Sequence, residues 1–577
     1  MSSIRTWRAI CCGAVATLVW VPFPASGHAN ALFVDDFESG GADSWSREDA
    51  ATAAPGVEGA AAVKFFPALE NGVPGHYGVS LFAAPTASAV PELLVGSVGG
   101  VLGYVYRYAI VGFQAELSEL QAEQLSRHPL VQRVIQERYL EDSISYVYPH
   151  CYADSDNETD PNTDPFPPLP AGNGLPVEQE MVCSDPAPGG NCYSNWGLDR
   201  LDQDVDQIPN GPPRDESYQY RQDARSVTVF TIDTGVAKDN REFYDQGTLF
   251  SRVQQGVDTA CVPYPCGFGN IPCEGTWSSQ GHGTHVAAIL GGRTFGVAKD
   301  VNIIPIKALC TTTPPGQYST EQWKLAFEYV LLLHADTFPT AVVNLSALNQ
   351  NVPCVFNPIP ACDEYSQLRE AVISVARRDN LLLVQSSGNK QFTTDSLDAC
   401  SRSFGDELRY SDIVVPPAVI SDRDAVARIV IVAGSDENDG RLRITSGEPL
   451  TPIQSTIGTC VDIFAPAAHV ASAFFPVGLG IGEVPEEAVC QLSGTSMAAP
   501  HVSGLAALFL QDDPYMTSED LRALVLTRGL QGVLETNPAD PNYIGAGSPD
   551  LLLHWDPIVF EDGFETANFV AWSSYSP

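Results

Sequence analysis

Five short runs of apolar and β-branched residues between positions 227 and 432 most limit how this chain can fold. They are Val227–Ile232, Val301–Ile306, Ala341–Leu345, Leu381–Val384 and Ile429–Val432. None alternates cleanly between apolar and polar residues, as a strand with one face in water does. Such runs are typical of parallel strands that are covered on both faces. They therefore predict a mostly parallel sheet.

Helical stretches separate these runs. Glu321–His334 and Tyr365–Arg378 carry apolar residues at helical spacing. Parallel strands need crossover connections, and helices usually supply them. The sequence thus predicts an α/β domain, which we place at residues 195–555.

The first 31 residues are typical of a secretory signal peptide. Arg5 and Arg8 precede a short apolar run, Ile10–Val21, and small residues surround a cleavage point at Ala29–Ala31. The run is too short to span a membrane, and no later stretch of 18 apolar residues follows. We therefore expect a secreted, monomeric protein without a membrane anchor.

The 577 residues carry a formal net charge of −39. A chain this acidic should repel nucleic acid and anionic membranes, so neither is an expected partner. Solubility outside the cell is the favoured explanation. The alternative is that some carboxylates hold calcium, since hard cations prefer oxygen ligands.

Of the 14 cysteines, Cys11 and Cys12 belong to the signal peptide, which leaves an even number for an oxidising compartment. Several disulfides are expected, although the sequence does not fix their connectivity. Short-range candidates are Cys183 with Cys192, Cys354 with Cys362, and one bridge among Cys261, Cys266 and Cys273. A zinc site is disfavoured because no Cys-x2-Cys pair occurs.

A strand–helix–strand pattern precedes the α/β domain. Residues 104–111 and 131–139 are rich in β-branched and aromatic residues and predict strands. Between them, 118–127 predicts a helix with Ser118 as N-cap. We assign residues 104–148 to a small α+β domain and 32–103 to a separate N-terminal segment.

Residues 149–194 form a proline-rich linker without expected regular structure. Its acidic run, Asp154–Asp160, could bind calcium, but it lacks the glycine and final glutamate of an EF-hand loop. A plain acidic linker is favoured.

A short motif occurs near both ends of the chain. Phe33–Ser46 and Phe560–Ser573 match at six of 14 positions, which include two phenylalanines, an aspartate, a glutamate and a tryptophan. The second copy lies in a C-terminal tail, 556–577. A secretion tag or an inactive short strand is favoured over a sugar-binding role for the aromatic residues.

Two motifs supply a nucleophile and a base. Ser496 follows Gly494-Thr495 and opens a predicted helix, where backbone N–H groups favour negative charge. His282 lies between two glycines that allow close approach of substrate. His285 and His501, nearby in these motifs, are expected to be buried structural groups.

Two more residues complete the requirements for peptide hydrolysis. Asp233 ends a predicted strand and can orient the base. Asn389 also follows a strand, and its amide can donate to an oxyanion together with the backbone N–H of Ser496. No catalytic metal is needed.

These segments, in the order Asp, His, Ser, resemble the subtilisin-like serine proteases (subtilases), most closely the proteinase K branch. Further matching segments are Asn195–Arg200, Phe295–Ala298 and Cys460–Pro466. The resemblance implies a three-layer α/β sandwich with a twisted sheet. It also implies endopeptidase activity and an inhibitory propeptide in residues 104–148. A structural calcium ion is implied as well, held by the Asp462 carboxylate and the carbonyls of Ala427 and Ile429.

The residues expected to bind substrate depart from the family pattern. Ser346, Ala347 and Leu348 stand where the family has Ser-Leu-Gly, on the strand that pairs with substrate. Ser387 replaces an alanine next to Gly388 at the first specificity pocket, which makes its wall more polar. Cleft shape and specificity are therefore open.

Two functions follow. The first is a secreted serine endopeptidase, made as a zymogen that removes its own propeptide between Tyr148 and Asn195 and then cleaves proteins. The second is a catalytically silent binding or adhesion protein that retained the fold. The altered substrate strand and the repeated motif favour the second, whereas the complete set of catalytic residues favours the first.

Overall fold

The structure is a computed structural model of the chain. It describes residues 64–68, 71–84, 88–140, 150–152, 177–180, 195–203, 217–244, 250–259, 281–309, 318–346, 366–391, 425, 427–444, 453–474 and 488–556. The terminal repeats, the signal peptide and the suggested short-range cysteine pairs lie outside these ranges. Cys460 and Cys490 are both disulfide-bonded.

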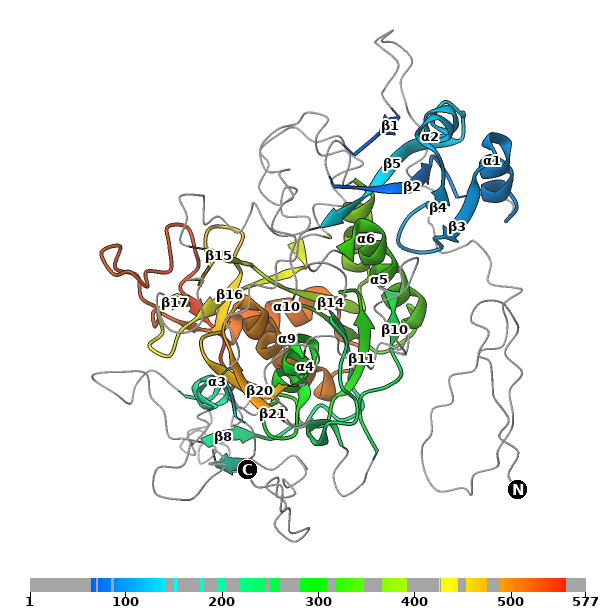
Figure 1. The fold of residues 1–577 in the computed structure, drawn as a ribbon. Helices are drawn as coiled ribbons and strands as arrows, with labels where there is room; N and C mark the ends of the chain where they lie inside the picture. Colours follow the sequence, from blue (N-terminus) through cyan, green and yellow to red (C-terminus); the bar gives the residue numbers. More distant parts are fainter. Residues whose placement is uncertain are drawn as a thin grey trace, which may run out of the picture. The chain divides into compact units, whose positions relative to one another are not determined.

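A nine-stranded sheet, here called the central sheet, organises residues 228–552 (Figure 1). Its strands, in spatial order, are β10 (Val257–Asp258), β11 (Asn302–Lys307), β9 (Thr228–Asp233), β13 (Ala341–Leu345), β14 (Leu381–Ser386), β16 (Val430–Ser435), β19 (Ile463–Pro466), β23 (Leu551–Leu552) and β22 (Leu530–Gln531). All neighbours pair in parallel except β22 with β23. The prediction of a mostly parallel sheet is confirmed, and all five predicted strands are present with ends that differ by at most three residues.

Successive residues of each central strand face two different helical layers. Val229, Val342 and Leu382 belong to a core cluster with α4 (His282–Gly291), α9 (Thr495–Asp512) and α10 (Ser518–Thr527). Their neighbours Phe230, Val343 and Leu383 belong to a second cluster with α5 (Thr320–Leu333) and α6 (Ser366–Ala376). Both faces are therefore buried, which explains the apolar runs and confirms the three-layer α/β sandwich.

A second sheet, here called the N-terminal sheet, contains β1 (Phe65–Phe66), β2 (Gly72–Leu81), β3 (Val101–Val105), β4 (Gly112–Glu116) and β5 (Val131–Leu140). It packs with α1 (Val90–Val98) and α2 (Glu119–Ser126) around a core of its own. Ser118 caps α2 and forms a capping box with Gln121, as the sequence predicted. The sheet begins at β1, well before the expected boundary at residue 104.

The predicted strand over 104–111 is wrong beyond Val105, where β3 ends. Tyr106, Ala109 and Ile110 instead form a loop whose side chains join the core cluster of α5 and α6. Tertiary burial thus explains the apolar and aromatic residues that suggested a strand.

The linker contains two short strands that the sequence analysis excluded. β6 (His150–Tyr152) pairs with β21 (Ala488–Leu492), and β7 (Val177–Glu180) pairs with β8 (Ser217–Tyr220). The prolines at 161, 165, 167, 168, 170 and 176 lie between β6 and β7 rather than inside them. The prolines therefore do not prevent short strands at the edges of the linker, and residues 153–176 lie outside the described ranges.

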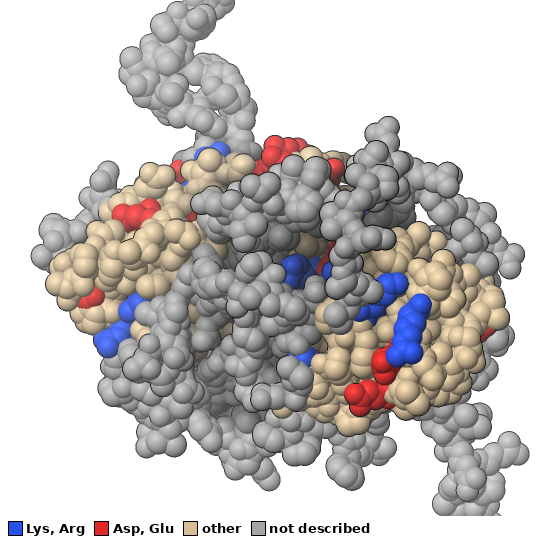
Figure 2. Space-filling model, turned by 90° about the horizontal axis from the view of Figure 1, so that it is seen from above, with Lys and Arg blue, Asp and Glu red and all other residues tan. Residues whose placement is uncertain are grey.

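Charges of both signs lie close together on the described surface. On the face in Figure 2, Lys and Arg side chains lie beside Asp and Glu. Within the described ranges, no helix is both long enough and apolar enough to cross a membrane.

Candidate active site

The predicted catalytic residues gather at the carboxyl ends of three adjacent central strands, β9, β13 and β14. Asp233 is the last residue of β9, Ser346 follows β13, and Asn389 lies three residues after β14. Parallel strands place their carboxyl ends along one edge, where α/β proteins build their sites. The N-terminus of α9, which carries Ser496, reaches this edge through contacts described below.

His282 contacts Asp233 directly. Its Nδ1 lies 2.8 Å from Asp233 Oδ1, and both side chains are almost fully buried. A carboxylate can only accept, so Nδ1 carries the proton of this bond and Nε2 of a neutral ring keeps its lone pair. Asp233 Oδ1 also accepts from the Thr234 backbone N–H at 2.7 Å. The carboxylate therefore fixes both the orientation and the tautomer of the imidazole.

The glycines around His282 are required by space and by backbone conformation. Gly281 precedes α4 with φ of 81°, in the left-handed region that favours glycine. A Cβ on Gly283 would lie 2.2 Å from the Gly235 carbonyl oxygen and 3.1 Å from Asp233 Oδ1. Any side chain at 283 would thus push α4 away from Asp233.

Ser496 is the second residue of α9, where backbone N–H groups have no partner within the helix. Its hydroxyl donates to the Ser346 carbonyl at 2.8 Å, and the Ser346 hydroxyl donates to the Ser496 carbonyl at 2.9 Å. Pro500, four residues on, has no N–H to donate to that Ser496 carbonyl. Ser346 therefore supplies the hydrogen bond that the proline removes from the helix.

Asn389 is oriented by the same helix end. Its Oδ1 accepts from the Thr495 backbone N–H at 2.9 Å and from Thr495 Oγ1 at 3.2 Å. A Cβ on Gly494 would lie 3.0 Å from Asn389 Nδ2. Glycine at 494 is thus what allows the Asn389 amide to lie beside the start of α9.

Thr495 is a positioning residue that the sequence analysis missed. Besides binding Asn389, its hydroxyl accepts from the Gly388 N–H at 3.1 Å. It joins the loop after β14 to the first turn of α9. Its place directly before Ser496 was the available signal.

His285 and His501 are buried structural groups, as the sequence predicted. His285 Nε2 donates to the carbonyls of Val470 and Cys490 at 3.1 and 3.0 Å, and burial lowers its pKa to about 3. His501 Nδ1 donates to the Met497 carbonyl at 2.8 Å, and burial lowers its pKa to about 4. Both are neutral near pH 7.

The predicted substrate-binding residues are only partly described. Ala347 and Leu348 lie outside the described residues. Ser387 is fully buried, and its hydroxyl accepts from Thr456 Oγ1 at 2.9 Å. Thr456 Oγ1 also lies 2.7 Å from the Ser387 carbonyl. Thr456 therefore binds the polar group that replaces the family's alanine.

The predicted calcium ligands do not fit a calcium ion. Asp462 Oδ1 lies 2.6 Å from Arg522 Nη2, and Oδ2 accepts from the Ile431 N–H at 2.8 Å. Arg522 Nε also lies 3.4 Å from the Ile429 carbonyl oxygen. Two of the three expected ligands thus face a guanidinium that already neutralises the carboxylate.

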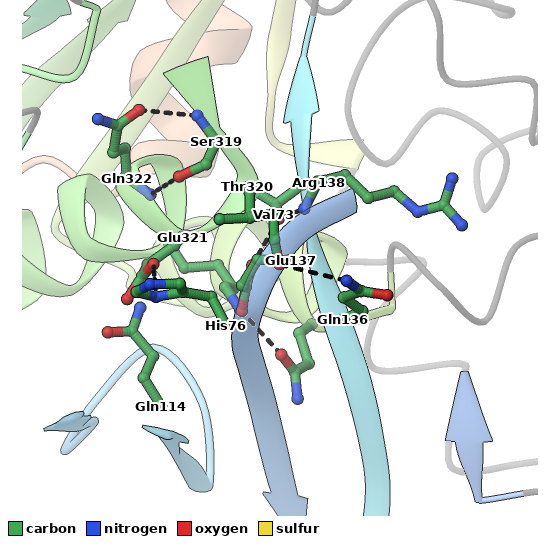
Figure 3. Close-up of polar contacts among 12 residues, drawn as sticks. Val73, His76, Gln114, Gln136, Glu137, Arg138, Ser319, Thr320, Glu321 and Gln322 are labelled. Carbon is green, nitrogen blue, oxygen red and sulfur yellow. Dashed lines mark hydrogen bonds and ion pairs between the residues drawn. The ribbon is translucent and has the colours of Figure 1, made fainter. Parts of the chain in front are cut away.

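The N-terminal sheet contacts the start of α5 through buried charges (Figure 3). Glu137 of β5 accepts from Lys324 Nζ and from the Thr320 hydroxyl. His76 Nδ1 of β2 lies 3.4 Å from Glu321 Oε2. Residues Tyr318 and Ser319, which form β12, extend the sheet by pairing with the end of β5.

Glu328 of α5 holds the loop after β3. Its carboxylate accepts from the backbone N–H groups of Arg107, Tyr108 and Ala109 at 2.7, 3.0 and 2.7 Å. Burial raises the pKa of this carboxyl, and the three hydrogen bonds oppose that rise. Together with the contacts at Glu137 and His76, this makes an extensive polar interface between α5 and the N-terminal sheet with the loop after β3.

Comparison with known proteins agrees with this geometry. Residues 224–547 match the subtilase family, and residues 86–141 match the peptidase inhibitor I9 family. The chain is similar to the alkaline serine exoprotease A of Vibrio alginolyticus, with 28% identity over 62% of this chain and 51% of the relative. It is also similar to an extracellular serine proteinase of a Thermus species, with 27% identity over 63% and 66%. The matched region therefore spans between half and two thirds of these two relatives.

A crystal structure of a cold adapted subtilisin-like serine proteinase also matches, with a TM-score of 0.42 and 27% identity over 62% of this chain and 97% of that one. The I9 match overlaps the N-terminal sheet that contacts α5. Since the subtilase match alone covers more than half of the 577 residues, the chain belongs to the subtilase family.

Proposed function

We propose that this protein is a secreted serine endopeptidase that cleaves proteins through an acyl-enzyme. The observation that carries the proposal is the buried 2.8 Å contact between His282 Nδ1 and Asp233 Oδ1 on the edge where α9 begins. Subtilase membership and the names of the relatives agree with it. Asp233, His282, Ser496 and Asn389 are its catalytic residues.

In this mechanism His282 Nε2 is the general base. The Ser496 hydroxyl rotates away from the Ser346 carbonyl and toward the imidazole as substrate enters, since catalytic hydrogen bonds often form only in the complex. Ser496 Oγ bonds to the scissile carbonyl carbon while its proton passes to Nε2. Asp233 stabilises the imidazolium, which then protonates the leaving amine. A water molecule then attacks the acyl-enzyme in the same way, with His282 again as the base. This step releases the carboxylic acid product and restores the Ser496 hydroxyl.

The oxyanion is stabilised by two donors of different origin. The Ser496 backbone N–H comes from the open first turn of α9. The Asn389 amide N–H comes from the loop after β14, and its position depends on Thr495. Donors held before the reaction lower the barrier because they need no reorganisation.

The substrate is proposed to bind at the carboxyl ends of β13 and β14. Ser346, Ala347, Leu348, Ser387 and Gly388 are proposed to line the cleft on the side of β13 and β14. Because Ser387 binds Thr456, we expect it to be held by this contact rather than free to follow a substrate side chain. Specificity then depends on cleft shape more than on a polar contact from Ser387.

The protein is further proposed to be synthesised as a zymogen with a signal peptide at 1–31. The I9 match and the buried contacts on α5 support inhibition by the N-terminal sheet. The relatives named as exoprotease or extracellular proteinase support secretion.

A fluorophosphonate probe tests the peptidase proposal against the silent binding protein. We expect the purified protein to hydrolyse casein and to be labelled by the probe, and Ser496→Ala to do neither. Ser548→Ala is a matched control, because the Ser548 hydroxyl binds the Ile544 carbonyl and the Gly458 N–H rather than the catalytic residues. A folded protein with neither labelling nor casein cleavage supports the silent alternative.

A further inference from the structure

Arg522 occupies the position at which the family resemblance expects a calcium ion. The expected ligands were the carboxylate of Asp462 and the carbonyls of Ala427 and Ile429. Arg522 Nη2 lies 2.6 Å from Asp462 Oδ1, and its Nε lies 3.4 Å from the Ile429 carbonyl oxygen. One guanidinium thus faces both a charged and a neutral ligand of the expected ion.

The helix that carries Arg522 is anchored at this place. α10 begins after Thr517, whose hydroxyl accepts from the Asp520 N–H as an N-cap. The Ser518 N–H donates to the Asp379 carbonyl at 2.6 Å, which ties the first turn of α10 to the segment before β14. Arg522 follows one turn later, and only 24% of its side chain is exposed. Its contact with Asp462 is therefore built into the packing.

The carboxylate has little capacity left for a metal. Asp462 Oδ2 accepts from the Ile431 N–H at 2.8 Å, so both oxygens already have donors. Calcium needs six to eight oxygen ligands at 2.3–2.6 Å. It would have to displace the guanidinium and leave that charge next to a divalent ion.

A second arginine, Arg428, directly precedes Ile429 and pairs with Asp379 and Glu519. Its charge is therefore balanced by carboxylates of its own, and Arg522 is the cation that the structure places against Asp462.

We propose that this chain replaces the calcium ion at Asp462 with the side chain of Arg522, so that this site binds no calcium. The ion and the guanidinium perform the same task, since each joins the start of β16 to the turn before β19. Arginine does so without a dependence on free calcium. The proposal does not rest on peptidase activity.

Calcium stoichiometry gives the first test. We use the full chain with Ser496→Ala, which cannot digest itself, and titrate calcium by calorimetry with and without Asp462→Asn. We expect the same number of calcium sites in both proteins, whatever that number is. The loss of one site on Asp462→Asn overturns the proposal.

Thermal unfolding gives the second test. In the same background, we compare Asp462→Asn, Arg522→Gln and the double variant in chelator and in millimolar calcium. Each single change should lower the Tm by a few degrees in both solutions, and the double variant should lose less than the sum, because one contact is removed twice. Additive losses in chelator, or an Asp462→Asn loss that appears only with calcium, contradict the proposal.

The thermal test has two controls. Arg522→Lys retains the charge and serves if Arg522→Gln does not fold. Arg377, the residue that follows α6, and Glu370 within α6 form a comparable, partly exposed pair at 3.0 Å. The same comparison of single and double variants on that pair measures how far calcium weakens an ordinary surface ion pair in this acidic chain.

Discussion

Ser346 and Ser496 exchange two hydrogen bonds, each hydroxyl donating to the other residue's backbone carbonyl at 2.9 and 2.8 Å. The pair joins the end of β13 to the first turn of α9. Asn344 extends it, since its amide donates to the Ser346 hydroxyl at 3.0 Å and its carbonyl oxygen accepts from Ser503. Position 346 therefore bears on the proposed nucleophile as well as on the proposed substrate edge.

Ser346→Ala removes the donor to the Ser496 carbonyl, which Pro500 cannot replace. A buried carbonyl left without a partner costs about 1–3 kcal/mol of folding free energy. We also expect kcat to fall about tenfold, which corresponds to about 1.4 kcal/mol in the activation barrier, with little change in KM. Peptide hydrolysis and denaturant unfolding measure the two effects. Wild-type values of both kcat and stability would show that the two hydrogen bonds between Ser346 and Ser496 are unimportant.

Asn389→Asp separates the two tasks of the Asn389 side chain. Aspartate still offers an oxygen to the Thr495 N–H, so we expect the variant to fold with a Tm close to that of the parent. It lacks the amide donor, and loss of one oxyanion donor lowers kcat by about 10²–10³. Asn389→Ala is the comparison, because it should lose stability as well as kcat. Full turnover by a folded Asn389→Asp protein would remove Asn389 from the mechanism.

The sequence predicted the central sheet and the burial of both its faces. It could do so because the central strands are short and apolar, with helices packed on both sides. It also located the Asp233, His282 and Asn389 positions, since strand ends and flanking glycines are visible in the chain. Beyond its place directly before Ser496, the sequence did not indicate the role of Thr495, because that role depends on a loop more than 100 residues away meeting α9.

Two differences between sequence and structure have the same physical origin. The loop at 106–110 looks like a strand because its aromatic residues are buried, yet they are buried by α5 and α6 rather than by neighbouring strands. The family resemblance predicts a calcium ligand at Asp462, but in the structure Asp462 pairs with Arg522, 60 residues further along. Local patterns report burial and chemistry without reporting which distant segment supplies the contact.

His76 makes the contact between the N-terminal sheet and α5 dependent on pH. Its hydrogen bond to Glu321 is the largest cause that raises its pKa above the ordinary value of 6.5, and Glu116 and Glu137 add to the rise. Lys324, which pairs with Glu137, is the nearby positive charge. Since the folded pKa is above the unfolded one, this stabilisation is complete below about pH 6.5 and is lost as the pH rises through the folded value.

The corresponding experiment follows thermal unfolding of the Ser496→Ala protein with and without His76→Gln from about pH 5 to about pH 9. Glutamine keeps a hydrogen-bonding group but carries no charge, so the Tm difference should be largest at the acidic end and shrink at the alkaline end. His128→Gln is a control, because the His128 ring accepts from a backbone N–H of Leu130. A Tm difference that does not change with pH would refute the role of His76.

Self-processing should give a mature N-terminus between Tyr148 and Asn195. The N-terminal sheet ends at Leu140 and contacts the catalytic domain through Glu137, His76 and the loop held by Glu328. A cut beyond residue 148 breaks the backbone between that sheet and the subtilase domain, and the contacts at Glu137, His76 and Glu328 then help to retain it. The contact at His76 should weaken as the pH rises. N-terminal sequencing of the secreted protein measures the position, and Ser496→Ala should retain the uncut chain. A mature wild-type protein that begins at Leu32 would instead show that only the signal peptide is removed.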